Sequence, residues 1–159
     1  MNICVVCSGN ICRSPFCEQV LKRELNEKYT IYSAGLLEIF GSPAYDPCVK
    51  LAPLYKVNLS SHSSQGMTPI IAEKTNIFLV MTKRHNVLLQ RDFNIAYNKI
   101  LLLSTFLPND KIIDLGILGT TQRGADIPDP MGQRIEVVRP VFDVLNIACI
   151  GFSKWIQSH

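Results

Sequence analysis

The chain has 159 residues, a length that suits one domain able to bury a sizeable core. Its residues are 47% hydrophobic and 18% charged, which is typical of a globular protein and excludes a disordered one. The net charge is +3 and the sixteen basic residues form no dense cluster, so neither nucleic acid nor an anionic membrane is indicated as a partner.

Four apolar runs predict strands that are buried on both faces of a parallel sheet, because their apolar residues are consecutive and do not alternate with polar ones. They cover residues 3–6, 31–32, 77–81 and 100–103. The spacing of apolar residues predicts helices between them, over residues 15–28, 45–55, 69–74 and 84–91. This alternation predicts an α/β fold over residues 1–159, a single domain with helices on both sides of the sheet.

The tail has the clearest helical periodicity. Its apolar residues recur at steps of three and four, at Ile135, Val138, Phe142, Leu145, Cys149, Phe152 and Ile156. Pro140 interrupts this pattern, because an interior proline removes a hydrogen bond and crowds the preceding turn. The sequence leaves two alternatives open: the helix kinks at Pro140, or it begins near that residue.

Targeting and redox signals are weak. No basic segment followed by an apolar stretch opens the chain, and no apolar run approaches membrane-spanning length, so we expect a soluble, cytoplasmic protein. We expect its six cysteines to be reduced thiols. Cys4, Cys7 and Cys12 lie close together, but no second pair of ligands follows, so we expect no zinc site.

Residues 7–13, CSGNICR, lie between the first strand and the first helix, where α/β folds bind their ligands. Five residues between Cys7 and Arg13 can curl so that their N–H groups point at one centre and bind a dianion. Gly9 and Asn10 most easily adopt the left-handed angles of such a turn, and Arg13 offers a planar fork for phosphate oxygens. The same donors, with the Ser14 hydroxyl, would stabilise a Cys7 thiolate that attacks phosphorus.

This spacing is not specific by itself, since Cys17 and Arg23 satisfy it too. That second pair lies on a continuous amphipathic stripe without glycine, which predicts that Cys17 faces the core. A phosphatase also needs an acid for the leaving oxygen, and DIPDPMG at residues 126–132 offers Asp126 and Asp129 on a proline-rich loop. Asp-Pro is also a common turn initiator, so a purely structural role for this stretch stays open.

Together these motifs resemble the low-molecular-weight protein tyrosine phosphatase family. The resemblance is carried by VCSGNICRSP at residues 6–15 and continues through SAG (33–35), LSSH (59–62), MTKRH (81–85) and DPMG (129–132). It implies a three-layer sandwich with a four-stranded parallel sheet, and a two-step mechanism without metal or cofactor. By this resemblance Cys7 forms a phosphocysteine, Arg13 clamps the phosphate, and Asp129 acts as general acid and then as base.

The resemblance also implies the residues that bind substrate. The loop residues expected to hold the phosphoryl group or to shape its site are Ser8, Gly9, Asn10, Ile11, Cys12 and Ser14. Ser33 would help to hold the loop, whereas His62 either joins it or is a surface or capping residue. Family members that prefer phosphotyrosine usually carry an aromatic residue where this chain has Met131, and we expect Phe40 to supply the other aromatic wall.

The expected partner is a phosphorylated protein or peptide, with phosphate, vanadate or other oxyanions as ligands of the site. Ile11 is typical of the tyrosine-directed branch, whereas phosphoarginine phosphatases of the same fold carry threonine there. The alternatives are therefore a protein arginine phosphatase and a non-catalytic phosphate-binding module. An arsenate reductase fits poorly, because no cysteine lies between Cys48 and Cys149. Cys12 either captures an oxidised Cys7 as a disulfide or packs beneath the loop.

Overall fold

The computed structural model describes all residues from Met1 to His159. Four parallel strands form a central sheet in the order β2-β1-β3-β4, as predicted. They are β1 (Asn2–Cys7), β2 (Thr30–Gly35), β3 (Ile77–Val80) and β4 (Ile100–Leu102). The inner strand β1 pairs with β2 and β3, and Cys7 stands opposite Gly35 at its carboxyl end.

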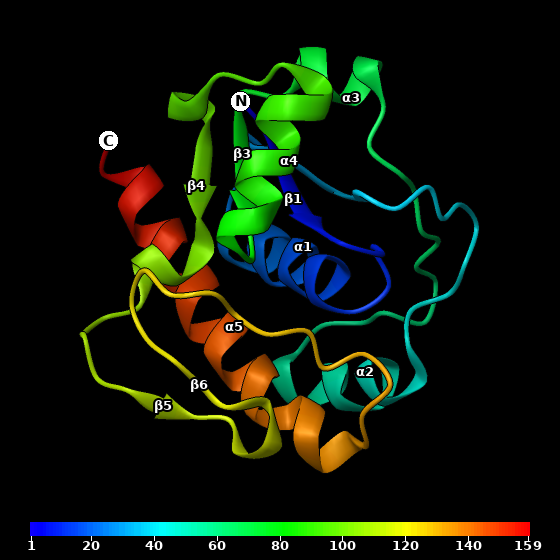
Figure 1. Ribbon diagram of the computed structural model, residues 1–159, viewed down its shortest axis with the longest axis vertical. Helices are drawn as coiled ribbons and strands as arrows, with labels where there is room; N and C mark the ends of the chain where they lie inside the picture. The colour runs from blue at the N-terminus through cyan, green and yellow to red at the C-terminus, as the bar shows by residue number, and fades with distance from the viewer.

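Helices cover both faces of this sheet, which gives the three-layer sandwich (Figure 1). One layer contains α1 (Arg13–Glu24) and α5 (Ile135–Gln157), with the short α2 (Asp46–Leu51) packed against α5. The other layer contains α3 (Pro69–Lys74) and α4 (Lys83–Phe93). The helix predicted over residues 45–55 is split, since a 3-10 turn (Ala52–Tyr55) follows α2 where Pro53 cannot donate a hydrogen bond.

The core lies on both sides of β1. Ile3 and Val5 are fully buried against α1 and α5, whereas Cys4 and Val6 are fully buried in a second cluster beneath α3 and α4. Successive residues of a strand point to opposite faces, so a strand covered on both faces must be apolar throughout. This arrangement explains why the apolar residues of the strand are consecutive.

Helix α5 begins at Ile135 and continues through Pro140, so the alternative that it begins near the proline is wrong. Its apolar stripe is buried on both sides of the proline, at Val138 and Phe142. The Phe142 ring stacks on Phe16 of α1, with centroids 4.0 Å apart and planes 17° apart. This contact packs α5 against α1 within one turn of the proline.

A two-stranded antiparallel hairpin, β5 (Ile113–Asp114) with β6 (Thr120–Thr121), lies outside the main sheet and was not predicted. Two residues per strand are too few to show a periodicity. The segment from β6 to α5 passes the carboxyl ends of the strands (Figure 1). The remaining short elements are 3-10 turns over Tyr97–Lys99, Leu103–Phe106 and Gly116–Leu118. None of the helices has the length and apolar character needed to cross a bilayer.

Candidate active site

The loop over residues 7–13, called the phosphate loop below, connects β1 to the N-terminus of α1. Asn10 takes a left-handed backbone conformation, with φ of 57°, as predicted, whereas Gly9 does not. The glycine that the loop requires is Gly35 of β2, because a Cβ atom there would lie 2.8 Å from the Ser8 carbonyl oxygen. Sequence reasoning missed this role of the SAG motif, which lets the loop pack directly on β2.

Two hydrogen-bond donors surround the sulfur of Cys7. Its Sγ lies 2.9 Å from Ser14 Oγ, and the backbone N–H of Asn10 donates to it at 3.3 Å. The sulfur also sits at the N-terminus of α1, where the helix dipole favours negative charge. Donors of this kind stabilise a thiolate, which is the nucleophilic form of cysteine.

The Asn10 side chain fixes the shape of the loop from inside. Its Nδ2 donates to Ser14 Oγ at 2.9 Å and to Ser33 Oγ at 2.8 Å, while its Oδ1 accepts from the backbone N–H of Gln65 at 2.9 Å. His62 Nε2 lies 2.7 Å from the Asn10 carbonyl oxygen, so the histidine joins this network. A fully buried polar side chain with every group bonded holds a single conformation.

The network continues to a carboxylate that sequence reasoning missed. Ser33 Oγ donates to Glu18 Oε2 of α1 at 2.5 Å, and Lys22 pairs with the other oxygen of the same carboxylate at 2.5 Å. Gln65 Nε2 donates to the Ser33 carbonyl at 2.8 Å. Glu18 carried no signal in the sequence, because a glutamate on an amphipathic helix is usually a solvated residue.

Arg13 is the first residue of α1 and only 3% of its side chain is exposed. Its Nη1 donates to the Ile127 carbonyl at 2.8 Å, and its Nη2 lies 3.4 Å from Asp129 Oδ2. The Ile127 N–H donates in turn to the carbonyl of Met81, directly after β3, at 2.9 Å. A guanidinium fixed on two sides is oriented before any oxyanion binds.

The two candidate acids have different surroundings. Asp126 Oδ1 accepts from the backbone N–H of Lys83 at 2.8 Å and thereby ties its loop to the start of α4. Asp129 lies beside Arg13, keeps 44% of its side chain exposed and accepts from the Met131 N–H at 3.1 Å. Asp129 is therefore the carboxyl group placed at the mouth of the phosphate loop.

A cavity of about 160 Å³ opens over Cys7 between the phosphate loop and Asp129. Its apolar walls come from Ile11, Leu37, Ile39 and Met131. Phe40 does not line it: the ring is 61% exposed and packs over Gly66. Two aliphatic side chains of the 36–40 segment therefore occupy the place expected for an aromatic wall.

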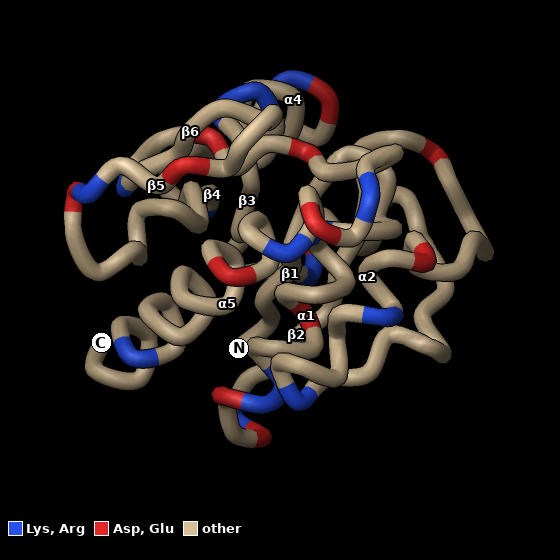
Figure 2. The backbone as a smooth tube through the Cα atoms, turned by 90° about the horizontal axis from the view of Figure 1, so that it is seen from below, with Lys and Arg blue, Asp and Glu red and all other residues tan.

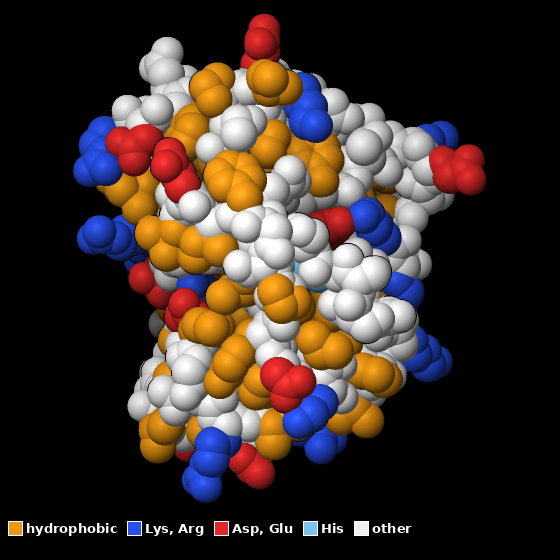
Figure 3. All heavy atoms as spheres, turned by 90° about the vertical axis from the view of Figure 1, so that its right-hand side faces the viewer, with side chains coloured by type: hydrophobic (Ala, Val, Ile, Leu, Met, Phe, Trp, Pro, Cys, Tyr) orange, Lys and Arg blue, Asp and Glu red, His pale blue; other side chains and the backbone are white.

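Charge around the site is mixed. Figure 2 looks onto the carboxyl ends of the strands from below, and residues of both signs are interspersed there. Figure 3 shows another side of the molecule, where basic and acidic side chains are scattered and no basic patch gathers. No broad basic surface surrounds the site, so any attraction for an oxyanion would have to come from Arg13 and the loop amides.

The Ser8 side chain contacts a buried histidine that sequence reasoning quoted only as part of a motif. His85 Nε2, from the first turn of α4, lies 3.0 Å from Ser8 Oγ. Burial, and next the nearby charge of Arg13, lower the pKa of His85 to about 4. The imidazole is therefore neutral at physiological pH.

All six cysteines are buried, and none forms a disulfide. Cys12 Sγ lies 2.8 Å from Cys48 Sγ of α2, and this hydrogen bond, together with burial, raises the pKa of the Cys12 thiol. Cys17 faces the core, as predicted, and its pKa is raised by burial and by a hydrogen bond with Cys149. Cys12 thus both lines the cavity and packs beneath the loop.

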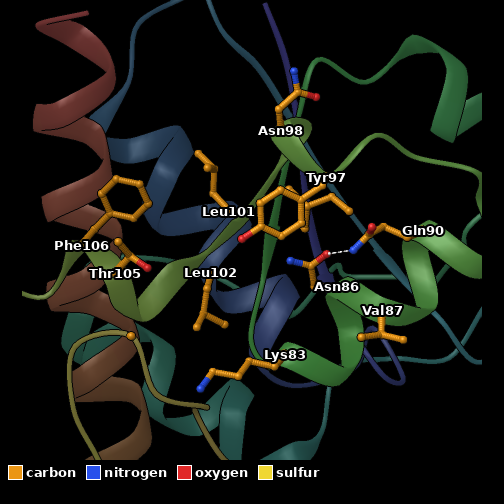
Figure 4. A pocket seen from close by; sticks show the side chains of 12 residues that line it. Lys83, Asn86, Val87, Gln90, Tyr97, Asn98, Leu101, Leu102, Thr105 and Phe106 are labelled. Carbon is orange, nitrogen blue, oxygen red and sulfur yellow. Dashed lines mark hydrogen bonds between the residues drawn. The ribbon is translucent and has the colours of Figure 1, made fainter.

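A larger cavity of about 540 Å³ lies between α4 and the outer strand β4 (Figure 4). Leu102 and Phe106 line it opposite Tyr97, and Asn86 accepts a hydrogen bond from Gln90 Nε2 at 2.7 Å. It contains no cysteine, histidine or carboxylate, so no nucleophile or acid is paired there. The nucleophile and acid found together over Cys7 thus have no counterpart in this larger cavity.

Comparison with known proteins agrees with this geometry. The model of the low molecular weight phosphotyrosine protein phosphatase family matches residues 2–159. The chain belongs to this family. AmsI of Erwinia amylovora, named a probable low molecular weight protein-tyrosine-phosphatase, is 35% identical to it over 113 residues, which cover 71% of this chain and 78% of AmsI.

Solved structures of the family show the same architecture. The YwlE arginine phosphatase of Geobacillus stearothermophilus has a TM-score of 0.83 at 25% identity, covering 99% of this chain and 93% of that one. The tyrosine phosphatase Wzb from Escherichia coli K30, in complex with sulphate, has a TM-score of 0.82 at 26% identity, covering 98% and 97%. The family and fold predicted from the sequence are thus confirmed.

Proposed function

We propose that this protein tyrosine phosphatase hydrolyses phosphotyrosine in proteins or peptides through a phosphocysteine intermediate. The observation that carries the proposal is the position of Cys7 Sγ, bonded by Ser14 and the Asn10 amide in a cavity that also contains Arg13 and Asp129. A nucleophile, an anion clamp and an acid therefore converge on one small space.

In the first step the phosphoryl group lies in the phosphate loop, held by the amides of residues 8–13 and by Arg13. The Cys7 thiolate attacks phosphorus, the bond to the phenolic oxygen breaks, and Asp129 gives its proton to that oxygen. Charge on the equatorial oxygens is stabilised by donors fixed before the reaction begins.

In the second step the Asp129 carboxylate takes a proton from a water molecule. The water oxygen attacks phosphorus, the phosphorus–sulfur bond breaks, and inorganic phosphate leaves with the Cys7 thiolate regenerated. Ser14 and the Asn10 amide stabilise that thiolate as leaving group, as they stabilise it as nucleophile. One carboxyl group thus acts first as acid and then as base.

The cavity walls support an aryl phosphate as substrate. Ile11, Leu37 and Met131 present hydrocarbon and a thioether, which contact an aromatic ring favourably. A phosphoarginine would place a polar guanidino group against the same side chains. The similarity to an arginine phosphatase, at a TM-score of 0.83, nevertheless makes phosphoarginine the second candidate.

The proposal is tested with p-nitrophenyl phosphate in the presence of EDTA. We expect turnover by the native protein, none by Cys7→Ser, and a phosphorylated Cys7 peptide after rapid acid quenching. Full activity in Cys7→Ser would overturn the mechanism, and tight vanadate binding without turnover of any phosphoester would favour a phosphate-binding module. The cytoplasmic location and the peptide or protein partner stay predictions.

A further inference from the structure

The contact between Ser8 and His85 joins the phosphate loop to α4. His85 is 4% exposed, and its Nε2 lies 3.0 Å from Ser8 Oγ, while its Nδ1 has no hydrogen-bond partner. Ser8 itself lines the cavity over Cys7. A buried histidine therefore reaches the reaction site through one hydroxyl group.

The bond is not needed to hold the loop backbone. The Ser8 carbonyl already accepts from the Leu37 N–H at 2.8 Å, and the Cys7 carbonyl accepts from the Leu36 N–H at 3.0 Å. His85 is fixed separately, because its own N–H donates to Thr82 Oγ1 at 3.1 Å as part of the helix cap. What the side-chain contact does determine is the direction of the Ser8 hydroxyl proton.

A neutral imidazole has one N–H, on either Nδ1 or Nε2. With the proton on Nδ1, the structure would bury an N–H without an acceptor, which folded proteins rarely do. With the proton on Nε2, only an acceptor lone pair is left unpaired, and Nε2–H donates to Ser8 Oγ. The second tautomer leaves the Ser8 proton free to point into the cavity.

We propose that His85 is a positioning residue that orients the Ser8 hydroxyl as an additional donor to the phosphoryl oxygens. The inference deepens the proposed function and rests on it, since the acceptor is the oxyanion in the loop. Ser8 then stabilises the transition state alongside Arg13 and the loop amides, and His85 acts only through Ser8.

The test uses the dissociation constant of vanadate, a transition-state mimic, together with kcat/KM for p-nitrophenyl phosphate. A hydrogen bond to a charged group is worth about tenfold in affinity, so we expect Ser8→Ala to weaken vanadate binding by about that factor. His85→Asn should match it, because its amide is one methylene too short to reach Ser8. His85→Gln, which places an N–H near the position of Nε2, should remain within about threefold of the native protein.

The double variant Ser8→Ala/His85→Asn separates positioning from a structural role. If His85 acts through Ser8, the double variant binds vanadate as well as Ser8→Ala alone. The inference would be overturned if adding His85→Asn to Ser8→Ala weakened vanadate binding by the same factor as His85→Asn does alone. Unchanged vanadate binding in Ser8→Ala would also overturn it. If circular dichroism shows that His85→Asn does not fold, His85→Gln is introduced into the native protein and into Ser8→Ala instead. A marked loss of vanadate affinity from His85→Gln in either protein would count against the inference.

These outcomes are distinguishable from failure of the proposed function. A native protein that turns over no phosphoester would contradict the proposed function, yet its vanadate affinity would still report on Ser8 and His85. An active native protein with no effect of Ser8→Ala would contradict this inference alone.

Discussion

The Ser14 hydroxyl oxygen lies 2.9 Å from Cys7 Sγ and accepts a hydrogen bond from Asn10 Nδ2, also at 2.9 Å. Because its oxygen already accepts from Asn10, the Ser14 hydroxyl proton is free to point at the sulfur. One side chain thus orients the hydroxyl that stabilises the thiolate, and Asn10 is oriented in turn by Ser33 and Gln65.

We expect Ser14→Ala to lower kcat about tenfold, because a hydrogen bond to a charged group is lost from the thiolate as nucleophile and as leaving group. Steady-state kinetics with p-nitrophenyl phosphate measures this change. Ser153→Ala is the matched control, since that buried serine donates within α5 to the Cys149 carbonyl, away from the site. Equal losses in both variants would indicate a general effect on folding.

Asp129→Asn should lower turnover by about 10²-fold or more for substrates whose leaving group needs a proton. The loss should be smaller with p-nitrophenyl phosphate, because p-nitrophenol leaves readily as the anion. Turnover is therefore measured with a series of aryl phosphates whose leaving groups differ in pKa. Asp126→Asn is the control, because that carboxylate bonds the Lys83 amide and should affect stability instead. A large loss in Asp126→Asn with none in Asp129→Asn would reassign the acid.

Gly35→Ala should disturb the phosphate loop, since its Cβ would approach the Ser8 carbonyl oxygen to 2.8 Å. We expect destabilisation of about 1–3 kcal/mol in urea unfolding, and a loss of vanadate affinity. Gly9→Ala is the matched comparison, because its Cβ would meet only side-chain atoms, of Ile11 at 3.4 Å and of Ile39 at 3.7 Å. A larger effect at Gly9 than at Gly35 would contradict this account of the loop.

Peroxide should inactivate the protein through Cys7, and dithiothreitol should restore it if Cys12 captures the sulfenic acid as a disulfide with loss of water. Recovery should be much poorer in Cys12→Ser. The Cys12 pKa is raised by the hydrogen bond to Cys48 and by burial, so its thiolate fraction, and hence the capture rate, should increase from pH 7 to pH 9. Equal recovery in both proteins would leave Cys12 as a packing residue.

Much of the fold could be predicted because local pattern and tertiary burial agree. The consecutive apolar residues of β1 indicated a strand covered on both faces, and the stripe of α5 indicated a helix against the sheet. The effect of Pro140 could not be predicted, because tolerance of a missing hydrogen bond depends on tertiary packing, such as that of Phe142 on Phe16, which the local pattern does not show.

The site was predictable where its residues are adjacent in sequence and less so where they are not. The phosphate loop carries its own signal in residues 7–13, with Asn10 in the left-handed conformation as expected. Glu18 and Gln65 join the network only through the fold, and nothing in their local sequence marks them. His85 lies in the MTKRH motif, but the motif does not reveal its contact with Ser8. Phe40 was expected from the family resemblance as the aromatic residue that follows the SAG motif, but the chain direction after β2 places Leu37 and Ile39 at the cavity instead.

The most direct test of the central claim compares kcat/KM for matched phosphotyrosine and phosphoarginine peptides, in the native protein and in Ile11→Thr. Ile11, Leu37 and Met131 form an apolar wall, so we expect the native protein to prefer phosphotyrosine and Ile11→Thr to reduce that preference. A native protein that prefers the phosphoarginine peptide would contradict the assignment.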